Sequence, residues 1–256
     1  MVMGIVNVTP DSFSDGGRFL DAEAAIAHGL ELLAEGASIL DVGGESSRPG
    51  AEPVDLATEL ARVIPVVEAL AAHGRVSIDT RKAEVARAAV AAGATMINDI
   101  SAQLWPIAAE LGVGWVAMHM LGEPGTMQSD PTYDDVVGEV SEFLRDAATR
   151  AAGAGVREIW VDPGFGFGKT LEHNLQLLAN IDRIVALGWP VLVGTSRKAM
   201  LGRLLADSDG VVDPVAPDDR LAGSIASEVW LMHNGVTMIR AHDVRSAIQA
   251  AKVVAA

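Results

Sequence analysis

The chain has 256 residues, half of them hydrophobic and none of them cysteine, and its formal net charge is −15 from 19 basic and 34 acidic residues. This length fits one large α/β domain over residues 1–256. The acidic balance argues against a nucleic-acid or anionic-membrane partner, and the lack of cysteine excludes disulfides, thiolate nucleophiles and Cys-bound zinc. With no signal-peptide pattern and no apolar run near the roughly 20 residues of a membrane helix, we expect a soluble cytoplasmic protein.

Short apolar runs alternate along the chain with longer stretches in which apolar residues recur every three or four positions. The runs predict strands at Val2–Val6, Ser38–Val42, Val76–Ile78, Thr95–Ile97, Gly114–Met118, Glu158–Val161, Val191–Val193 and Thr237–Arg240. The longer stretches predict helices at Asp21–Glu35, Leu56–Ala72, Glu84–Ala92, Ile107–Leu111, Asp134–Ala152, Leu171–Leu187, Leu221–Asn234 and Val244–Val254. The acidic segment Asp207–Asp219 is interpreted as a surface excursion. Strand-then-helix units with short connections predict a closed (β/α)8 barrel, and an open doubly wound sheet is the alternative.

Polar side chains follow every predicted strand, at the end where barrel enzymes carry their chemistry. In chain order they are Asn7, Asp41 with the Gly43–Gly50 loop, Asp79, Asn98 and Asp99, His119, Asp162, Ser196 to Lys198, and Arg240 to His242. Helix capping accounts for some of these residues, but a purely structural barrel would not need all of them. Since the chain is acidic overall, an anionic substrate would require a local basic pocket.

Two glycine-rich segments only partly match known motifs. Gly164–Thr170 looks like a phosphate-binding P-loop, but Pro163 stands where that pattern requires glycine. Gly194–Lys198 looks like a nucleophile elbow, but Lys198 replaces its closing glycine. The six histidines show no spacing typical of a catalytic zinc site. The sequence therefore gives no support to these three chemistries.

Several segments, taken together and in order, resemble the dihydropteroate synthase family. They are Asn7–Gly17, Gly44–Gly50, Ser77–Thr80, Asn98–Ile100, Asp162–Lys169, Ser196–Lys198 and Arg240–Asp243. The resemblance spans nearly the whole chain and implies a TIM barrel. It also implies a transferase that condenses p-aminobenzoate with a hydroxymethyl-dihydropterin diphosphate, releases pyrophosphate through a dissociative, carbocation-like substitution, and forms a homodimer.

The resemblance assigns roles to individual residues. The pterin would be bound by Asp79, Asn98, Met118, Asp162, Phe167 and Lys198, with the Asp162 carboxylate accepting two ring N–H groups in parallel. The diphosphate would be bound by Asn7, Arg48, Arg240 and His242, and Asn7 would also hold Mg²⁺. The p-aminobenzoate pocket would comprise Phe13, Ser47, Arg48, Pro49, Phe167 and Ser196, the last at the start of an expected helix. The catalytic residues would be Asp79, Asp162, Lys198 and Arg240.

Each of these residues also has a simpler interpretation. Asp79 could cap a helix, and Asp162 before proline could begin a turn. Lys198 could be an exposed helix lysine, Lys169 is most simply solvated, and His119 is interpreted as a packing residue.

Two alternative functions share the pterin-binding barrel. One is a methyltetrahydrofolate-dependent methyltransferase, which would not need the Asn7, Ser46-Ser-Arg-Pro49 or Ser196–Lys198 segments. The other is a non-catalytic pterin-binding paralogue, in which loop or diphosphate residues should be lost. Because those residues are present, we favour the synthase.

Overall fold

The eight predicted strands are all present in the computed structural model, which describes residues 1–9, 18–46 and 50–256. They are β1 (Val2–Asn7), β2 (Ile39–Gly43), β3 (Val76–Asp79), β4 (Met96–Asp99), β5 (Gly114–Met118), β6 (Ile159–Asp162), β7 (Leu192–Val193) and β8 (Met238–Ala241). The bounds of β5 are as predicted, six strands differ by one residue at one or both ends, and β4 begins one residue later and ends two residues later than predicted.

The strands form a nearly closed barrel, as predicted. They are paired in the order β6-β5-β4-β3-β2-β1-β8-β7, and each pairing is parallel. The two edge strands meet at a parallel bridge between Val161 and Val191, where the Val161 N–H donates to the Pro190 carbonyl at 3.0 Å. A sequential order that returns on itself is that of a barrel, so the open doubly wound alternative is wrong.

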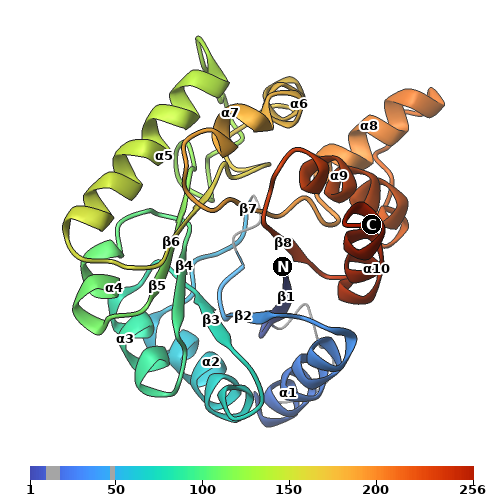
Figure 1. Cartoon of the computed structure of the whole chain (residues 1–256). Helices are drawn as coiled ribbons and strands as arrows, with labels where there is room; N and C mark the ends of the chain where they lie inside the picture. Colours follow the sequence, from blue (N-terminus) through green and yellow to red (C-terminus); the bar gives the residue numbers. More distant parts are fainter. Residues whose placement is uncertain (10–17, 47–49) are drawn as a thin grey trace.

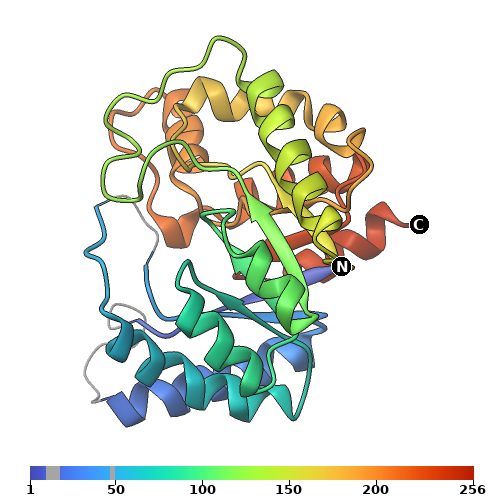
Figure 2. The same cartoon turned by 90° about the vertical axis from the view of Figure 1, so that its left-hand side faces the viewer.

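The helices lie outside the ring of strands (Figure 1). They are α1 (Arg18–Glu35), α2 (Leu56–Ala71), α3 (Ala83–Ala91), α4 (Trp105–Leu111), α5 (Val136–Gly153), α6 (Leu171–Ala179), α7 (Ile181–Val185), α8 (Ala199–Asp209), α9 (Leu221–His233) and α10 (Val244–Val254). The turned view in Figure 2 shows the same layering from the side. Among the residues described, no helix is long and apolar enough to cross a membrane.

Two predicted boundaries are wrong. The single helix expected over Leu171–Leu187 is split at Asn180, which ends α6 and precedes α7. The surface excursion expected over Asp207–Asp219 begins later, because α8 continues to Asp209 and ends at Gly210 in the left-handed conformation with φ 69°. Beyond it, the 3-10 turn η2 (Pro217–Asp219) leads into α9.

The alternation of side chains along the strands divides the core in two. Outward-facing residues such as Val42, Ile78 and Val161 belong to the large cluster that packs against the helices. Inward-facing residues near the amino ends of seven strands form a separate apolar layer inside the barrel: Met3, Ile39, Met96, Val116, Trp160, Leu192 and Met238. This layer fills the barrel interior, so only the carboxyl end is available for a polar site.

Candidate active site

The polar residues of the site lie directly above the inner apolar layer. Because side chains alternate along a strand, the residue two positions after each member of the layer also faces inward. Those positions are Ile5, Asp41, Asn98, Met118, Asp162, Gly194 and Arg240, and Asp79 occupies the matching place on β3. Five of the polar residues predicted at strand ends, Asp41, Asp79, Asn98, Asp162 and Arg240, are therefore brought together by strand geometry alone.

A buried network of charges connects β2, β3, β4 and β8. The Arg240 guanidinium donates from Nε to Asp41 Oδ2 at 2.7 Å and from Nη2 to Asp79 Oδ2 at 2.9 Å. The same Asp41 oxygen accepts from Asn98 Nδ2 at 2.8 Å. Asp41 is fully buried, and the sequence prediction had passed it over as a site residue. Its inward position on β2 was the signal that could have found it.

The charged state of this network follows from its burial. Burial raises the pKa of Asp79, and the neighbouring Asp41 charge raises it further, while Arg240 opposes both. Burial acts to lower the pKa of Arg240, but Asp41 and Asp79 more than offset this and raise it. Arg240 is therefore a permanent cation between two carboxylates, and Asp79 is the group whose proton occupancy is sensitive to its surroundings. The helix-capping interpretation of Asp79 is wrong, since Lys82 occupies the N-cap of α3.

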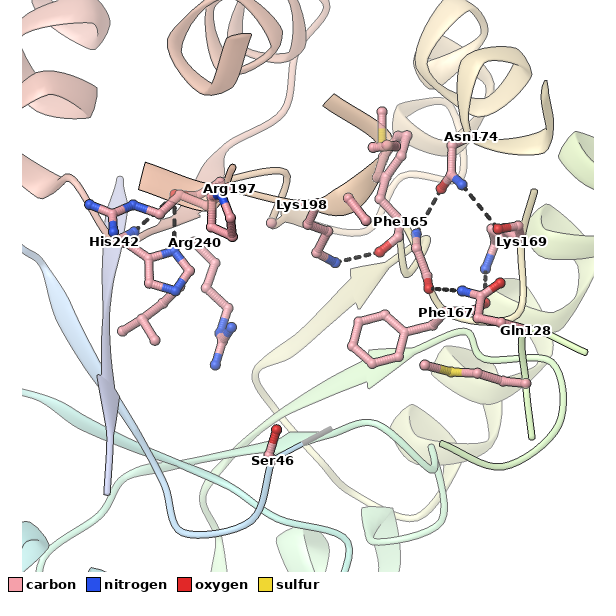
Figure 3. A pocket seen from close by; sticks show the side chains of 18 of the residues that line it. Ser46, Gln128, Phe165, Phe167, Lys169, Asn174, Arg197, Lys198, Arg240 and His242 are labelled. Atoms are coloured by element: carbon pink, nitrogen blue, oxygen red, sulfur yellow. Dashed lines mark hydrogen bonds between the residues drawn. The ribbon is translucent and has the colours of Figure 1, made fainter. Parts of the chain in front are cut away.

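Asp162 and Lys198 lie on the other side of the site. Asp162 is buried, and its Oδ1 accepts from the Gly164 N–H at 2.7 Å, so it begins a turn as well as facing inward. Burial raises its pKa, and the Lys198 charge is the largest influence that lowers it. Lys198 is not an exposed helix lysine: its Nζ donates to the Phe165 carbonyl and lies 4.6 Å from the centre of the Phe167 ring (Figure 3). Burial lowers the pKa of Lys198 to about 8.

A cavity of about 800 Å³ opens at this end of the barrel. Of the predicted site residues, it is lined by Asn7, Asp79, Phe167, Ser196, Lys198, Arg240 and His242. Asn98, Met118 and Asp162 are buried in the protein around the cavity and are not among its lining residues. Phe13, Ser47, Arg48 and Pro49 lie outside the residues that the structure describes.

The turn from Ser196 to Lys198 is held in an unusual backbone conformation. Arg197 has φ 58°, which is rare for a residue with a side chain. Its N–H donates to Ser224 Oγ at 2.9 Å, its carbonyl accepts from Arg220 Nη1 at 2.9 Å, and its guanidinium pairs with Asp243 at 2.7 Å. Such fixed, sparsely populated conformations are concentrated at functional sites.

Ser196 does not begin the helix that follows, because α8 starts at Ala199 with Lys198 as its N-cap. The Ser196 hydroxyl instead lies 3.1 Å from both the backbone nitrogen and the Nδ1 atom of His242. At the start of α8, the N–H groups of Lys198 and Leu201 donate within the turn, whereas those of Ala199 and Met200 have no hydrogen-bond acceptor among the described residues. Both of these residues line the cavity. Asp243, the residue after His242, pairs with Arg197.

Lys169 was expected to be solvated, and this is wrong. Its side chain is enclosed by the loop after β6, with only 3% of its surface exposed. His119, interpreted as a packing residue, is buried edge-on against Phe143 and also contacts Lys169. No sequence pattern of charge or periodicity distinguished Lys169 from a surface lysine.

No cluster of three or more His, Asp or Glu side chains in the described part of the chain could hold a metal ion by itself. Asn7, at the end of β1, lines the cavity and offers a single amide oxygen. Mg²⁺ usually keeps several waters and is bound through one or two protein oxygens together with substrate phosphates. Asn7 therefore fits a metal held mainly by a bound diphosphate.

The chain is similar to known proteins over its whole length. The family model described as pterin binding enzyme matches residues 3–242. Dihydropteroate synthase of Mycobacterium leprae is 49% identical over 265 residues, an alignment that covers 100% of this chain and 92% of that protein.

Solved structures give the same result. Xanthomonas albilineans dihydropteroate synthase with 4-aminobenzoic acid superposes with a TM-score of 0.89 at 50% identity, covering 98% of this chain and 90% of that one. The same enzyme in complex with 7,8-dihydropteroate gives a TM-score of 0.85 at 46% identity, covering 98% of this chain and 91% of the other. Neither alternative function is favoured by these similarities. The chain belongs to the pterin-binding enzyme family, among the dihydropteroate synthases.

Proposed function

We propose that the cavity at the carboxyl end of the barrel catalyses the dihydropteroate synthase reaction, with separate groups of residues for its three substrate moieties. In that reaction the amino nitrogen of p-aminobenzoate displaces diphosphate from the methylene carbon of a hydroxymethyl-dihydropterin diphosphate. The observation that carries the proposal is the inward layer of Asp79, Asn98, Asp162 and Arg240 directly above an apolar floor. This arrangement suits a flat heterocycle with polar edges.

The pterin is assigned to the β3, β4 and β6 side of the barrel. An aminopyrimidinone edge presents parallel N–H donors, which an ionised carboxylate accepts more strongly than a neutral group. Asp162 supplies that carboxylate, and the Lys198 charge counteracts the effect of burial on the Asp162 pKa. Asn98 and Asp79 extend the polar edge, while Met118 and Phe167 give apolar walls. Lys198 would also donate to ring acceptors.

The diphosphate is assigned to β1 and β8. Arg240 uses Nε and Nη2 on the two carboxylates, and its Nη1 makes no hydrogen bond to any residue that the structure describes. Nη1 can therefore meet a phosphate oxygen without breaking the buried ion pairs. His242 and Asn7 line the same cavity, and Arg48 is assigned here by resemblance. Mg²⁺, held by Asn7 and the phosphates, would stabilise negative charge on the departing oxygen.

The p-aminobenzoate is assigned to the outer part of the cavity, between Phe167 and the start of α8. Its carboxylate suits the free N–H groups of residues 199 and 200, and Ser196 lies just before them. Phe13, Ser47, Arg48 and Pro49 remain assigned by resemblance. This placement puts the amine nearest to the pterin side.

In the chemical step, the carbon–oxygen bond to the diphosphate breaks and both electrons leave with the oxygen. Positive charge on the methylene carbon is shared with the pterin ring, which the Asp162 carboxylate stabilises electrostatically. The amine lone pair then forms the carbon–nitrogen bond, and one N–H proton is released to water. Little base catalysis is required, because an aromatic amine is neutral before it attacks.

Pyrophosphate release by the purified chain, with Mg²⁺ and both substrates, tests the assignment. In Asp162→Asn one acceptor oxygen becomes a donor, so one charge-assisted hydrogen bond of about 1.5–3 kcal/mol is lost and the other becomes a weaker neutral one, and kcat/KM should fall roughly 100-fold. The matched control is Asp146→Asn, an exposed carboxylate on α5, which should match the wild type. Release without p-aminobenzoate, or an Asp162→Asn variant as active as the control, would contradict the proposal.

The metal assignment has its own test. Removal of divalent ions with a chelator should abolish release, and Mg²⁺ should restore it. Asn7→Ala should raise the Mg²⁺ concentration needed for half-maximal activity, and an unchanged requirement would argue against Asn7 as the ligand. The homodimer and the cytoplasmic location stay predictions, and sedimentation analysis would measure the first of them.

A further inference from the structure

The loop after β6 is fixed by side chains that bind its backbone carbonyls. Lys169 Nζ donates to the carbonyls of Gly164 and Phe167, each at 3.0 Å. The carbonyls between them also accept side-chain donors, Phe165 from Lys198 and Gly166 from Gln128 (Figure 3). The Gly168 carbonyl accepts from the Tyr133 hydroxyl at 2.9 Å. Every carbonyl from residue 164 to residue 168 is therefore occupied by a side chain.

The three glycines of this loop have backbone conformations that other residues rarely adopt. Gly164, Gly166 and Gly168 all have positive φ, at 66°, 80° and 60°. A Cβ on Gly164 would lie 1.9 Å from the His119 carbonyl oxygen, and one on Gly168 would lie 2.2 Å from that of Leu121. Glycine is required at these contacts, but it loses more conformational entropy on folding than other residues. The conformation must therefore be maintained by groups outside the glycines.

Lys169 is placed at the centre of that support. Its Nζ has three acceptors at 3.0 Å, the two loop carbonyls and His119 Nδ1, and the His119 carbonyl is a more distant fourth at 3.4 Å. An ammonium has three N–H donors, so this arrangement matches them if His119 is neutral with its proton on Nε2. Burial, followed by the Lys169 charge, lowers the pKa of His119 to about 3, which keeps the imidazole neutral. Lys169 also lines the cavity, but the hydrogen bonds of its Nζ are made to the loop and to His119. Burial lowers the pKa of Lys169 to about 7, and the Asp162 charge opposes this effect.

The loop in turn holds the Lys198 ammonium. Lys198 Nζ donates to the Phe165 carbonyl and lies over the Phe167 ring. The Phe165 carbonyl and the Phe167 ring both belong to the Gly164–Gly168 loop, in which the Gly164 and Phe167 carbonyls accept hydrogen bonds from Lys169. Lys169 is thus linked to Lys198 through two contacts, one polar and one aromatic.

We propose that Lys169 is a positioning residue for the reaction, whose ammonium fixes the Gly164–Gly168 loop so that the Phe165 carbonyl and the Phe167 ring hold Lys198 in the cavity. The inference rests on the proposed function of the site. A purely structural Lys169 would change the thermal stability and the yield of folded enzyme. A positioning Lys169 also changes KM, because the ring that contacts p-aminobenzoate is displaced in the folded enzyme.

The test is a double-substitution cycle measured by pyrophosphate release. Lys169→Met should raise the KM for p-aminobenzoate by about 10-fold or more, as expected when a contact group moves by roughly 1 Å. Lys252→Met is the matched control, an exposed lysine on α10, and should leave both KM values unchanged. In a Phe167→Leu background, Lys169→Met should add a smaller increase than it does in the wild type, because only the Phe165 carbonyl contact is then left to transmit its effect.

The outcomes separate the two proposals. If the wild-type chain releases no pyrophosphate, both the proposed function and this inference are overturned. If the wild type is active, either of two results overturns the inference alone. The first is a folded Lys169→Met variant with unchanged KM values. The second is a double variant whose increase in KM equals the product of the increases in Lys169→Met and Phe167→Leu. If Lys169→Met does not fold, Tyr133→Phe removes only the donor to the Gly168 carbonyl. It should raise the same KM by a smaller factor, and no rise would overturn the inference.

Discussion

Replacing Arg240 by methionine removes the cation shared by two buried carboxylates. Asp41 is fully buried, and the side chains of Asp79 and Arg240 are 17% and 20% exposed. Loss of one partner from a buried ion pair costs about 3–5 kcal/mol, and the partial exposure of two members places this case near 3 kcal/mol. A chain of this size loses about 2–4 °C of Tm per kcal/mol, so the expected decrease is roughly 6–12 °C.

The pH dependence gives the sharper result. Without Arg240, the pKa of Asp79 rises above its already raised value of about 7. A carboxyl group whose pKa is raised by folding contributes stability at low pH, and this contribution is lost as pH rises through the folded-state pKa. For Asp79 the loss is nearly complete at about pH 7 in the wild type but continues above pH 7 in the variant. The difference in Tm from the wild type should therefore be larger at pH 8.5 than at pH 6.5.

Thermal unfolding at both pH values measures this, with Arg87→Met as the matched control. Arg87 pairs with Glu110 at 2.6 Å on the surface, where the two side chains are 41% and 58% exposed. Such pairs contribute about 0–1 kcal/mol, so the control should lose at most a few degrees. Equal decreases in the two variants, or a difference for Arg240→Met that does not change with pH, would refute this account of the network.

Two further predictions concern other parts of the fold. Glu228 is 1% exposed and its Oε2 has no partner in the described part of the chain, and burial raises its pKa to about 8. The folded chain keeps this proton up to about pH 8, so the wild type loses stability as pH rises from 5 to 8, whereas Glu228→Gln does not titrate. The free energy of unfolding in urea should therefore increase by a few kcal/mol for Glu228→Gln relative to the wild type over this range. A difference that is constant with pH would contradict this. Gly164→Ala places Cβ 1.9 Å from the His119 carbonyl and should greatly lower Tm and activity, whereas Gly112→Ala, also at positive φ but with open space around it, should cost only about 1 kcal/mol. Similar Tm values for the two alanine variants would show that the contact is relieved.

The barrel could be predicted because its determinants are local and repeated. Apolar runs and amphipathic spacing set the strands and helices, and the alternation along each strand then fixes which residues face inward. Asp162 and Arg240 lie at the inner position above a buried apolar residue, and Asp79 lies above Ser77. Their strand-end positions made them candidates, and the motifs of the resemblance assigned their roles. Asp41 had the same signal and was missed because no motif carried it.

The contacts between distant segments could not be predicted. Arg240 meets Asp41 across 199 positions of sequence, and only closure of the barrel brings β8 beside β1 and β2. Lys169 was misjudged for a related reason. A lysine is normally solvated, but three loop glycines leave room for the chain to surround its ammonium with carbonyls.

The acidic net charge and the anionic substrates are compatible because carboxylates position the cations of the cavity. Arg197 is held by Asp243, Arg203 pairs with Asp207, and Arg240 is held by Asp41 and Asp79. Each pair fixes a long side chain before substrate arrives, so less conformational entropy is lost on binding. Fixed donors also stabilise developing charge without reorganisation in the transition state. Lys198 is positioned differently, by a carbonyl and an aromatic ring, and this keeps its charge near Asp162 without neutralising it in a direct ion pair. The position of Lys198 therefore depends on the Gly164–Gly168 loop, whereas the positions of the three arginines depend on carboxylates.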